Sequence, residues 1–191
     1  MDRSSAFRRF FHIISPVFMG YYLLPEELGG PNTRITLKAV TLLFLGTAAC
    51  VEIARIALGI RLFGMRPYEG QRVSAYAQGA LGLGIALFLI RDPTIVIPVF
   101  LGMAWIDPLA AAARKNQWPR ALVVAAYFGL FIATEFAMTG TTNTGWVFFA
   151  AVLATTSAML VEGPKIPQLD DDLLMQVVPM ALLTLAARVL R

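Results

Sequence analysis

Long apolar runs alternate with short polar segments along the whole chain. An α-helix needs about 20 apolar residues to cross the hydrocarbon core of a bilayer, and seven runs approach this length, the first and sixth being the shortest. They cover residues 10–24, 35–60, 73–90, 94–113, 121–139, 146–161 and 173–190. The pattern predicts an all-α, polytopic membrane protein: one domain over residues 1–191, built as a bundle of six to seven transmembrane helices.

The polar segments between the runs differ in charge. If the N-terminus is cytoplasmic, eleven of the 16 Lys and Arg residues lie on the cytoplasmic side of the membrane. Cytoplasmic loops carry such an excess of Lys and Arg, so we predict a multi-pass protein of the cell membrane with its N-terminus inside. The first run has no small-residue cleavage pattern and is followed by Pro25-Glu26-Glu27. We therefore expect it to remain as the first helix.

Composition supports the membrane prediction and excludes some functions. The chain is 58% hydrophobic and 15% charged, against roughly 45–50% apolar and about 25% charged residues in a soluble domain. The net charge of +4 is explained by loops that face anionic lipids, so nucleic acid is not an expected partner. No Gly-x-x-x-x-Gly-Lys-Ser/Thr segment occurs, which excludes a P-loop enzyme. The single cysteine, Cys50, is expected to be a small core residue.

The segment between the last two runs is unusually acidic. Residues 162–172 read Glu-Gly-Pro-Lys-Ile-Pro-Gln-Leu-Asp-Asp-Asp. One aspartate is enough to cap the final helix, where a carboxylate interacts well with the helix dipole. Three adjacent aspartates repel one another unless they share a cation, and a divalent metal carrying a phosphate ester is a common guest of such clusters. The segment therefore indicates a metal site at the membrane surface.

Three further carboxylates, Glu52, Asp107 and Glu135, lie within the apolar runs. An ionised side chain at the centre of a membrane helix costs about 2.5–3.5 kcal/mol on insertion scales, so each carboxylate needs a partner. Glu52 has Arg55 one turn later on the same helix face, either as a structural ion pair or as part of a site. Asp107 precedes Pro108, which removes a backbone donor and loosens the helix. We interpret Asp107 as a functional residue.

Basic side chains gather on the same predicted side. Arg8, Arg9 and His12 share one helix face at the membrane entry, and the arginines of the second polar loop, Arg66 and Arg72 among them, extend this basic rim. Guanidinium groups bind phosphates well. Carboxylates for Mg²⁺, cations for phosphates and an apolar bundle open to lipid together favour phosphoryl or nucleotidyl transfer onto a lipid, for which positioning and charge neutralisation supply most of the rate.

These residues resemble motifs of the CTP-dependent polyprenol kinase family, which includes dolichol kinase, phytol kinase and a yeast-type diacylglycerol kinase. The family has a basic pair before a histidine, a Gly-Asp-Pro-Ala-Ala string, and a glutamate followed by Asp-Asp-Asn-Leu-Thr. The matching segments here are Arg8-Arg9-Phe10-Phe11-His12, Ile106-Asp107-Pro108-Leu109-Ala110-Ala111, and Glu162 with Asp170-Asp171-Asp172-Leu173-Leu174. The family's Lys-Ser-x-Glu-Gly segment has no counterpart between Arg114 and Arg120, so the chain resembles a divergent member.

The residues and the resemblance lead to one main hypothesis. The protein is expected to be a membrane-embedded lipid-alcohol kinase that uses Mg²⁺ to transfer a phosphoryl group from CTP, or another nucleoside triphosphate, to an isoprenoid alcohol or a diacylglycerol-like hydroxyl. Membrane lipids are further partners, and a homo-oligomer is compatible with the sequence. The site residues are predicted to be Asp107, His12 and Glu52 for catalysis, Arg72, Arg114, Lys115 and Lys165 for the nucleotide, and Glu162, Asp170 and Asp171 for the metal.

Two alternatives remain open at the level of sequence. A cytidylyltransferase acting on a lipid phosphate would use the same residues and differ only in the phosphate that is attacked. A non-catalytic pseudoenzyme or small transporter would instead use Glu52, Asp107 and Glu135 as relay or substrate-binding charges. The transporter hypothesis predicts carboxylates near both membrane surfaces and an internal repeat. Glu135 alone favours it, and no repeat is evident.

Overall fold

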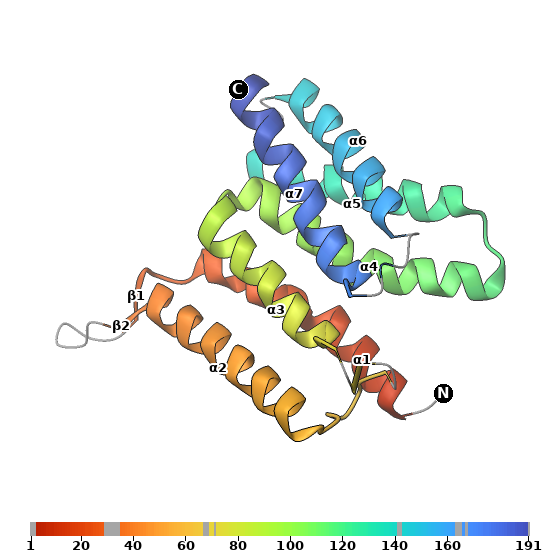
Figure 1. Cartoon of the computed structure of the whole chain (residues 1–191). Coiled ribbons are helices and arrows are strands. Elements are labelled where there is room, and N and C mark those ends of the chain that lie inside the picture. The colour runs from red at the N-terminus through yellow and green to blue at the C-terminus, as the bar shows by residue number, and fades with distance from the viewer. Residues whose placement is uncertain are drawn as a thin grey trace.

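The computed structural model describes residues 3–28, 35–66, 69–70, 72–140, 143–162, 166 and 168–190. Over these residues the chain forms seven α-helices and a single pair of two-residue strands, so the all-α prediction is confirmed (Figure 1). The elements are α1 (Arg3–Ile14), the 3₁₀ helix η1 (Ser15–Leu23), β1 (Glu27–Leu28), β2 (Ile35–Thr36), α2 (Leu37–Leu58), α3 (Ala75–Ile85), its π-helical continuation η3 (Ala86–Ile90), α4 (Pro93–Asn116), α5 (Arg120–Thr139), α6 (Thr144–Val161) and α7 (Asp171–Leu190).

Every predicted apolar run contains a helix, and short polar side chains set where several helices begin. Thr36 caps α2, Ser74 caps α3 and Asn143 caps α6, each by accepting a hydrogen bond from a backbone N–H of the first turn. The first run differs from the expectation of one regular helix. Its α-helix starts earlier, at Arg3, and becomes a 3₁₀ helix at Ser15, directly before a proline.

Five of the described helices are long and apolar enough to cross a membrane: α2, α4, α5, α6 and α7. One further apolar segment, Ala75–Ile90, is shorter and comprises α3 and η3. By length and composition, these helices are compatible with a membrane protein.

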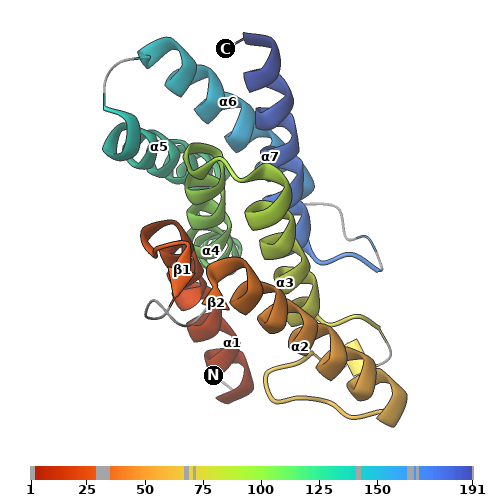
Figure 2. The same ribbon diagram turned by 90° about the vertical axis from the view of Figure 1, so that its left-hand side faces the viewer.

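Helix α4 lies at the centre of the bundle, where it packs against α1, η1, α5 and α7 (Figure 2). Its residues Val96, Val99 and Ala104 are completely buried. Close approach of α4 and α5 depends on Gly102, because a side chain there would overlap the ring of Tyr127. On the other side α7 packs against both α3 and α6. The ends of α1, α3, α4 and α7 are thereby held together.

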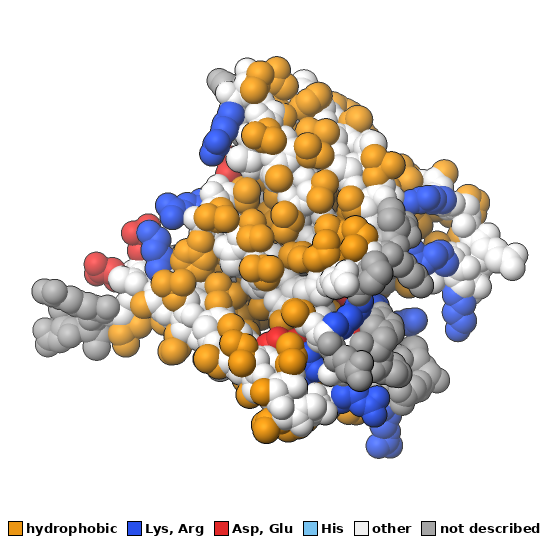
Figure 3. Space-filling view, viewed as in Figure 1, with side chains coloured by type: hydrophobic (Ala, Val, Ile, Leu, Met, Phe, Trp, Pro, Cys, Tyr) orange, Lys and Arg blue, Asp and Glu red, His pale blue; other side chains and the backbone are white. Residues whose placement is uncertain are grey.

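Helix α2 lies at an edge of the bundle beside α3 (Figures 1 and 2). Only 11% of its apolar window is buried within the protein. Cys50 is consequently exposed, and the expectation that it is a core residue is wrong because α2 has few neighbours. Hydrophobic side chains cover much of the face seen in Figure 3, while Lys and Arg side chains lie mainly near its edges.

Candidate functional site

A cavity of ≈ 230 Å³ lies among α1, η1, α2, α3, α4 and α7. Its lining is charged in one part and apolar in another. The charged and ionisable part comprises Arg8, Arg9, His12, Arg66, Asp107, Arg114, Asp171 and Asp172, and the apolar part includes Phe18, Phe44, Leu83 and Phe100. A ligand that fills this cavity would meet cations, carboxylates and hydrocarbon together.

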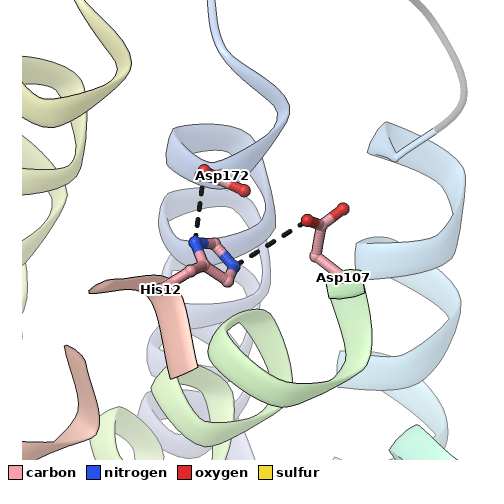
Figure 4. Close-up of side chains that lie close together, drawn as sticks. All are labelled: His12, Asp107 and Asp172. Atoms are coloured by element: carbon pink, nitrogen blue, oxygen red, sulfur yellow. Dashed lines mark ion pairs between the residues drawn. The ribbon is translucent and has the colours of Figure 1, made fainter. Parts of the chain in front are cut away.

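His12 lies between two aspartates from distant parts of the chain (Figure 4). Its Nδ1 is 3.6 Å from Oδ2 of Asp172, at the start of α7. Its Nε2 is 3.8 Å from Oδ2 of Asp107, on α4. All three side chains keep 15–26% of their surface exposed, so they are packed together and still open to the cavity.

A backbone contact selects the tautomer of His12. Nε2 lies 3.2 Å from the carbonyl oxygen of Met103, and because a carbonyl only accepts, Nε2 carries the hydrogen of this bond. In the neutral ring Nδ1 then has a free lone pair directed towards Asp172. The indole of Trp105 donates to the carbonyl of Ile13 at 3.1 Å, and this second bond fastens α1 to α4 beside the histidine.

The donor set of this trio suits a divalent cation. One ligand atom from each of His12, Asp107 and Asp172 lies within 4.8 Å of the others, and this is the one such group found in the described part of the chain. Mg²⁺ is usually held by one or two carboxylates together with substrate phosphates, which Asp107 and Asp172 match. An imidazole is a less common ligand for Mg²⁺ and suits Zn²⁺, Fe²⁺ or Ni²⁺ better.

The three adjacent aspartates have different surroundings. Asp170 is 2% exposed and caps α7, since its Oδ1 accepts from the N–H of Asp172 at 3.3 Å. Its Oδ2 faces Arg66 Nη1 at 3.4 Å and Arg72 Nη2 at 4.0 Å. Asp171 and Asp172 line the cavity instead. The capping role therefore belongs to Asp170, and two carboxylates remain for a ligand.

Gln78 of α3 fixes the start of α7. Its Oε1 accepts from the N–H of Asp170 at 2.7 Å, and its Nε2 donates to the carbonyls of Gln168 and Val73, both at 3.2 Å. Because Gln78 is 4% exposed, these bonds are shielded from water. They set the position from which Asp171 and Asp172 reach the cavity.

Glu162 is engaged by two arginines. Arg114 donates to its Oε1, and Arg120 Nη2 lies 3.7 Å from its Oε2. Arg114 also lines the cavity. Glu162 is 7% exposed. Its buried carboxylate is therefore paired with the arginines at the end of α4 and the start of α5. The metal role predicted for Glu162 stays a prediction.

Glu52 and Arg55 form a buried, bidentate ion pair on α2. Arg55 Nε and Nη2 donate to the two carboxylate oxygens at 2.9 and 2.7 Å, and Ser74 donates to the same carboxylate through its N–H and its hydroxyl. Arg55 also donates to the carbonyls of Glu69 and Arg72. The pair ties α2 to the loop before α3, and Glu52 is absent from the described cavity lining.

The predicted nucleotide-binding residues are not gathered in one place. Arg114 lines the cavity, Arg72 lies beside Asp170, and Lys115 is exposed at the end of α4. Lys165 falls outside the described residues. Arg8, Arg9 and Arg66, which the sequence indicates only as a general basic rim, line the cavity with Arg114.

Two cavity residues on α7 were not predicted as site residues, namely Asp172 and Gln176. Asp172 stands where the resembling family has asparagine, and Gln176 occurs inside an apolar run. Their spacing of four residues places both on one helix face. This spacing is the sequence feature from which their joint position in the site could have been predicted.

Glu69, in the loop that Arg55 holds, is buried with 1% exposure. Burial raises the pKa of its carboxyl above the ordinary value of 4.5, although Arg66, with Nε 4.0 Å from Oε1, acts in the opposite direction. Burial therefore makes this carboxyl group harder to ionise than that of a glutamate in water.

Comparisons of the chain with protein-family models, curated proteins and solved structures give no match.

Proposed function

We propose that the protein is a membrane-embedded lipid-alcohol kinase that transfers a phosphoryl group from a nucleoside triphosphate to the hydroxyl of a lipid. The observation that carries this proposal is the cavity in which four arginines, three aspartates and His12 adjoin Phe18, Phe44 and Phe100. Phosphoryl transfer needs cations and carboxylates around the phosphates. A lipid acceptor needs an adjoining apolar surface, and few soluble substrates require both.

The membrane setting belongs to the same proposal. The first apolar segment, formed by α1 and η1, the helices α2, α4, α5, α6 and α7, and the shorter segment Ala75–Ile90 would all cross the bilayer, with the N-terminus in the cytoplasm. The charged part of the cavity would then lie near the cytoplasmic surface, where nucleotides are available. The apolar part would extend towards the middle of the bilayer.

The reaction assigns separate roles to the residues of the cavity. The carboxylates of Asp107 and Asp172 would hold Mg²⁺, which when bound neutralises charge on the phosphates. Arg8, Arg9 and Arg114 would bind phosphate oxygens. The resemblance to the CTP-dependent polyprenol kinases implies CTP as the donor.

His12 would act as the base. Its Nδ1 takes the proton of the lipid hydroxyl while Nε2 keeps its bond to Met103. The freed oxygen bonds to the γ-phosphorus, and the bond from this phosphorus to the β–γ bridging oxygen breaks. The products are a lipid phosphate and a nucleoside diphosphate.

The test is incubation of the purified protein in lipid with γ-labelled CTP or ATP, Mg²⁺, and a panel of polyprenols, phytol and diacylglycerol. A labelled lipid is the expected product. Asp107→Asn should remove at least about 100-fold of the activity, because a metal ligand is lost, while its folded yield stays near that of the wild type. Glu27→Gln, at an exposed residue of β1, serves as the matched control.

Product analysis separates this proposal from its alternatives. Release of pyrophosphate with a nucleotide-linked lipid would replace the kinase by a cytidylyltransferase. Absence of any modified lipid across both nucleotides and the whole panel would contradict both enzymes. Wild-type turnover in Asp107→Asn would contradict the assignment of the site.

A further inference from the structure

Gln176 of α7 is a buried polar residue in the wall of the cavity, one helical turn from Asp172. Its side chain is 0% exposed, and within the described residues neither the oxygen nor the nitrogen of its carboxamide has a hydrogen-bond partner. Gln176 nevertheless lines the cavity. A buried amide that faces a cavity with both groups unpaired is costly, and a ligand that pairs with it would remove this cost.

The fold makes room for this carboxamide. Gly82 of α3 lies against it, and any larger residue at position 82 would overlap Gln176 Oε1. The neighbouring cavity residue Leu83 is 3% exposed. The amide thus lies against the backbone of α3 at the wall of the cavity.

The position of Gln176 relative to Asp172 indicates what it would contact. The two residues are four apart on α7, so they lie on the same face about 6 Å apart along the helix axis. Asp172 and His12 mark the end at which the proposed reaction occurs. A ligand group bound beside Gln176 would therefore lie one helical turn from a group bound beside Asp172.

We propose that Gln176 is a specificity-determining residue, which binds a second polar group of the acceptor one helical turn deeper than the reacting hydroxyl. This inference rests on the proposed function. The acceptor is therefore a lipid with an ester carbonyl or a second hydroxyl beside its primary hydroxyl, as on a glycerol backbone. An alcohol whose chain is hydrocarbon from its first carbons would leave the carboxamide buried and unpaired.

The experiment measures binding without nucleotide or metal, so it does not depend on catalysis. The full-length protein in nanodiscs is loaded with a fluorescent short-chain diacylglycerol, which is then displaced by three competitors. 1,2-Dioctanoylglycerol offers ester carbonyls, 1-O-hexadecylglycerol offers a second hydroxyl without an ester, and geranylgeraniol offers neither. The wild type should prefer at least one glycerol compound over geranylgeraniol by about 10- to 100-fold.

Gln176→Leu should reduce this preference to within about twofold, with geranylgeraniol bound at least as well as before. Gln176→Met, which keeps the length of the side chain, provides a second test if the leucine variant folds poorly. Gln168→Leu, at an exposed glutamine, is the matched control and should keep the wild-type preference. If the Gln176 variants lose more affinity for 1,2-dioctanoylglycerol, Gln176 binds an ester carbonyl. If they lose more affinity for 1-O-hexadecylglycerol, Gln176 binds the second hydroxyl.

Equal binding of all competitors by the wild type, failure to bind any of them, or an unchanged preference in both Gln176 variants would overturn the inference. Failure of the proposed function is a different result. If the preference depends on Gln176 but no lipid is phosphorylated, the kinase proposal is wrong and Gln176 remains a residue that recognises lipid.

Discussion

At the scale of single residues, neighbours of identical type have different roles. Asp170 caps α7 and faces two arginines, whereas Asp172, two residues later, reaches the cavity and His12. Successive residues of a helix point in different directions, so adjacent aspartates separate as soon as the helix starts. The sequence predicts that this cluster holds a cation. The sequence cannot assign a role to each carboxylate, because the roles depend on where α7 begins and which helices pack beside it.

Asp172 gives the sharpest prediction at this scale. Asp172→Asn removes the charge of one proposed metal ligand and keeps the shape of the side chain. We expect the Mg²⁺ concentration for half-maximal kinase activity to rise by about 10-fold or more, because fewer anionic ligands bind the cation more weakly. Titration of activity with Mg²⁺ measures this. Asp170→Asn is the comparison: it should leave the Mg²⁺ requirement nearly unchanged, and an equal shift would contradict the separate roles.

At the scale of helices and loops, the apolar pattern predicts the elements well and their contacts poorly. All seven runs contain helices, and all but the first lie near the expected bounds, because length and hydropathy are local properties. The approach of His12 to Asp107, 95 residues away, depends on the docking of α1 against α4. The change from α1 to a 3₁₀ helix at Ser15 was also not predicted. Such features follow from packing, which hydropathy does not report.

The ion pair of α2 is hydrogen-bonded to the loop before α3. Arg55→Leu leaves Glu52 buried without its cation and removes the donor to the carbonyls of Glu69 and Arg72. We expect a loss of about 3–5 kcal/mol in unfolding free energy, as for other broken buried pairs, measured by denaturant unfolding in detergent.

The double variant Glu52→Leu/Arg55→Leu should recover part of this loss, since no unpaired charge stays buried. Arg188→Leu, at an exposed arginine near the end of α7, is the control and should unfold like the wild type. A single variant as stable as the wild type would show that the pair contributes little.

The buried carboxyl of Glu69 makes the same loop sensitive to pH. Because burial raises its folded pKa above 4.5, the native state binds this proton more tightly than the unfolded chain, and stability falls as pH rises through this window. Glu69→Gln mimics the neutral form. Its apparent unfolding midpoint in detergent should match that of the wild type near pH 4.5 and exceed it by a few degrees at pH 8. A difference that does not change with pH would refute this.

At the scale of the whole molecule, the proposed topology puts the charged part of the cavity on the cytoplasmic side, where most Lys and Arg residues are expected. Lys115 is exposed at the end of α4, next to Arg114 of the cavity, and would follow the fourth crossing, on the cytoplasmic side. Glu27 is exposed in β1 and would follow the first crossing, on the outer side. In a background with Cys50→Ser, an impermeant maleimide added to intact cells should label Glu27→Cys. It should label Lys115→Cys only after permeabilisation. The reverse pattern would place the arginines and aspartates outside, away from cytoplasmic nucleotides, and would contradict both the topology and the kinase proposal.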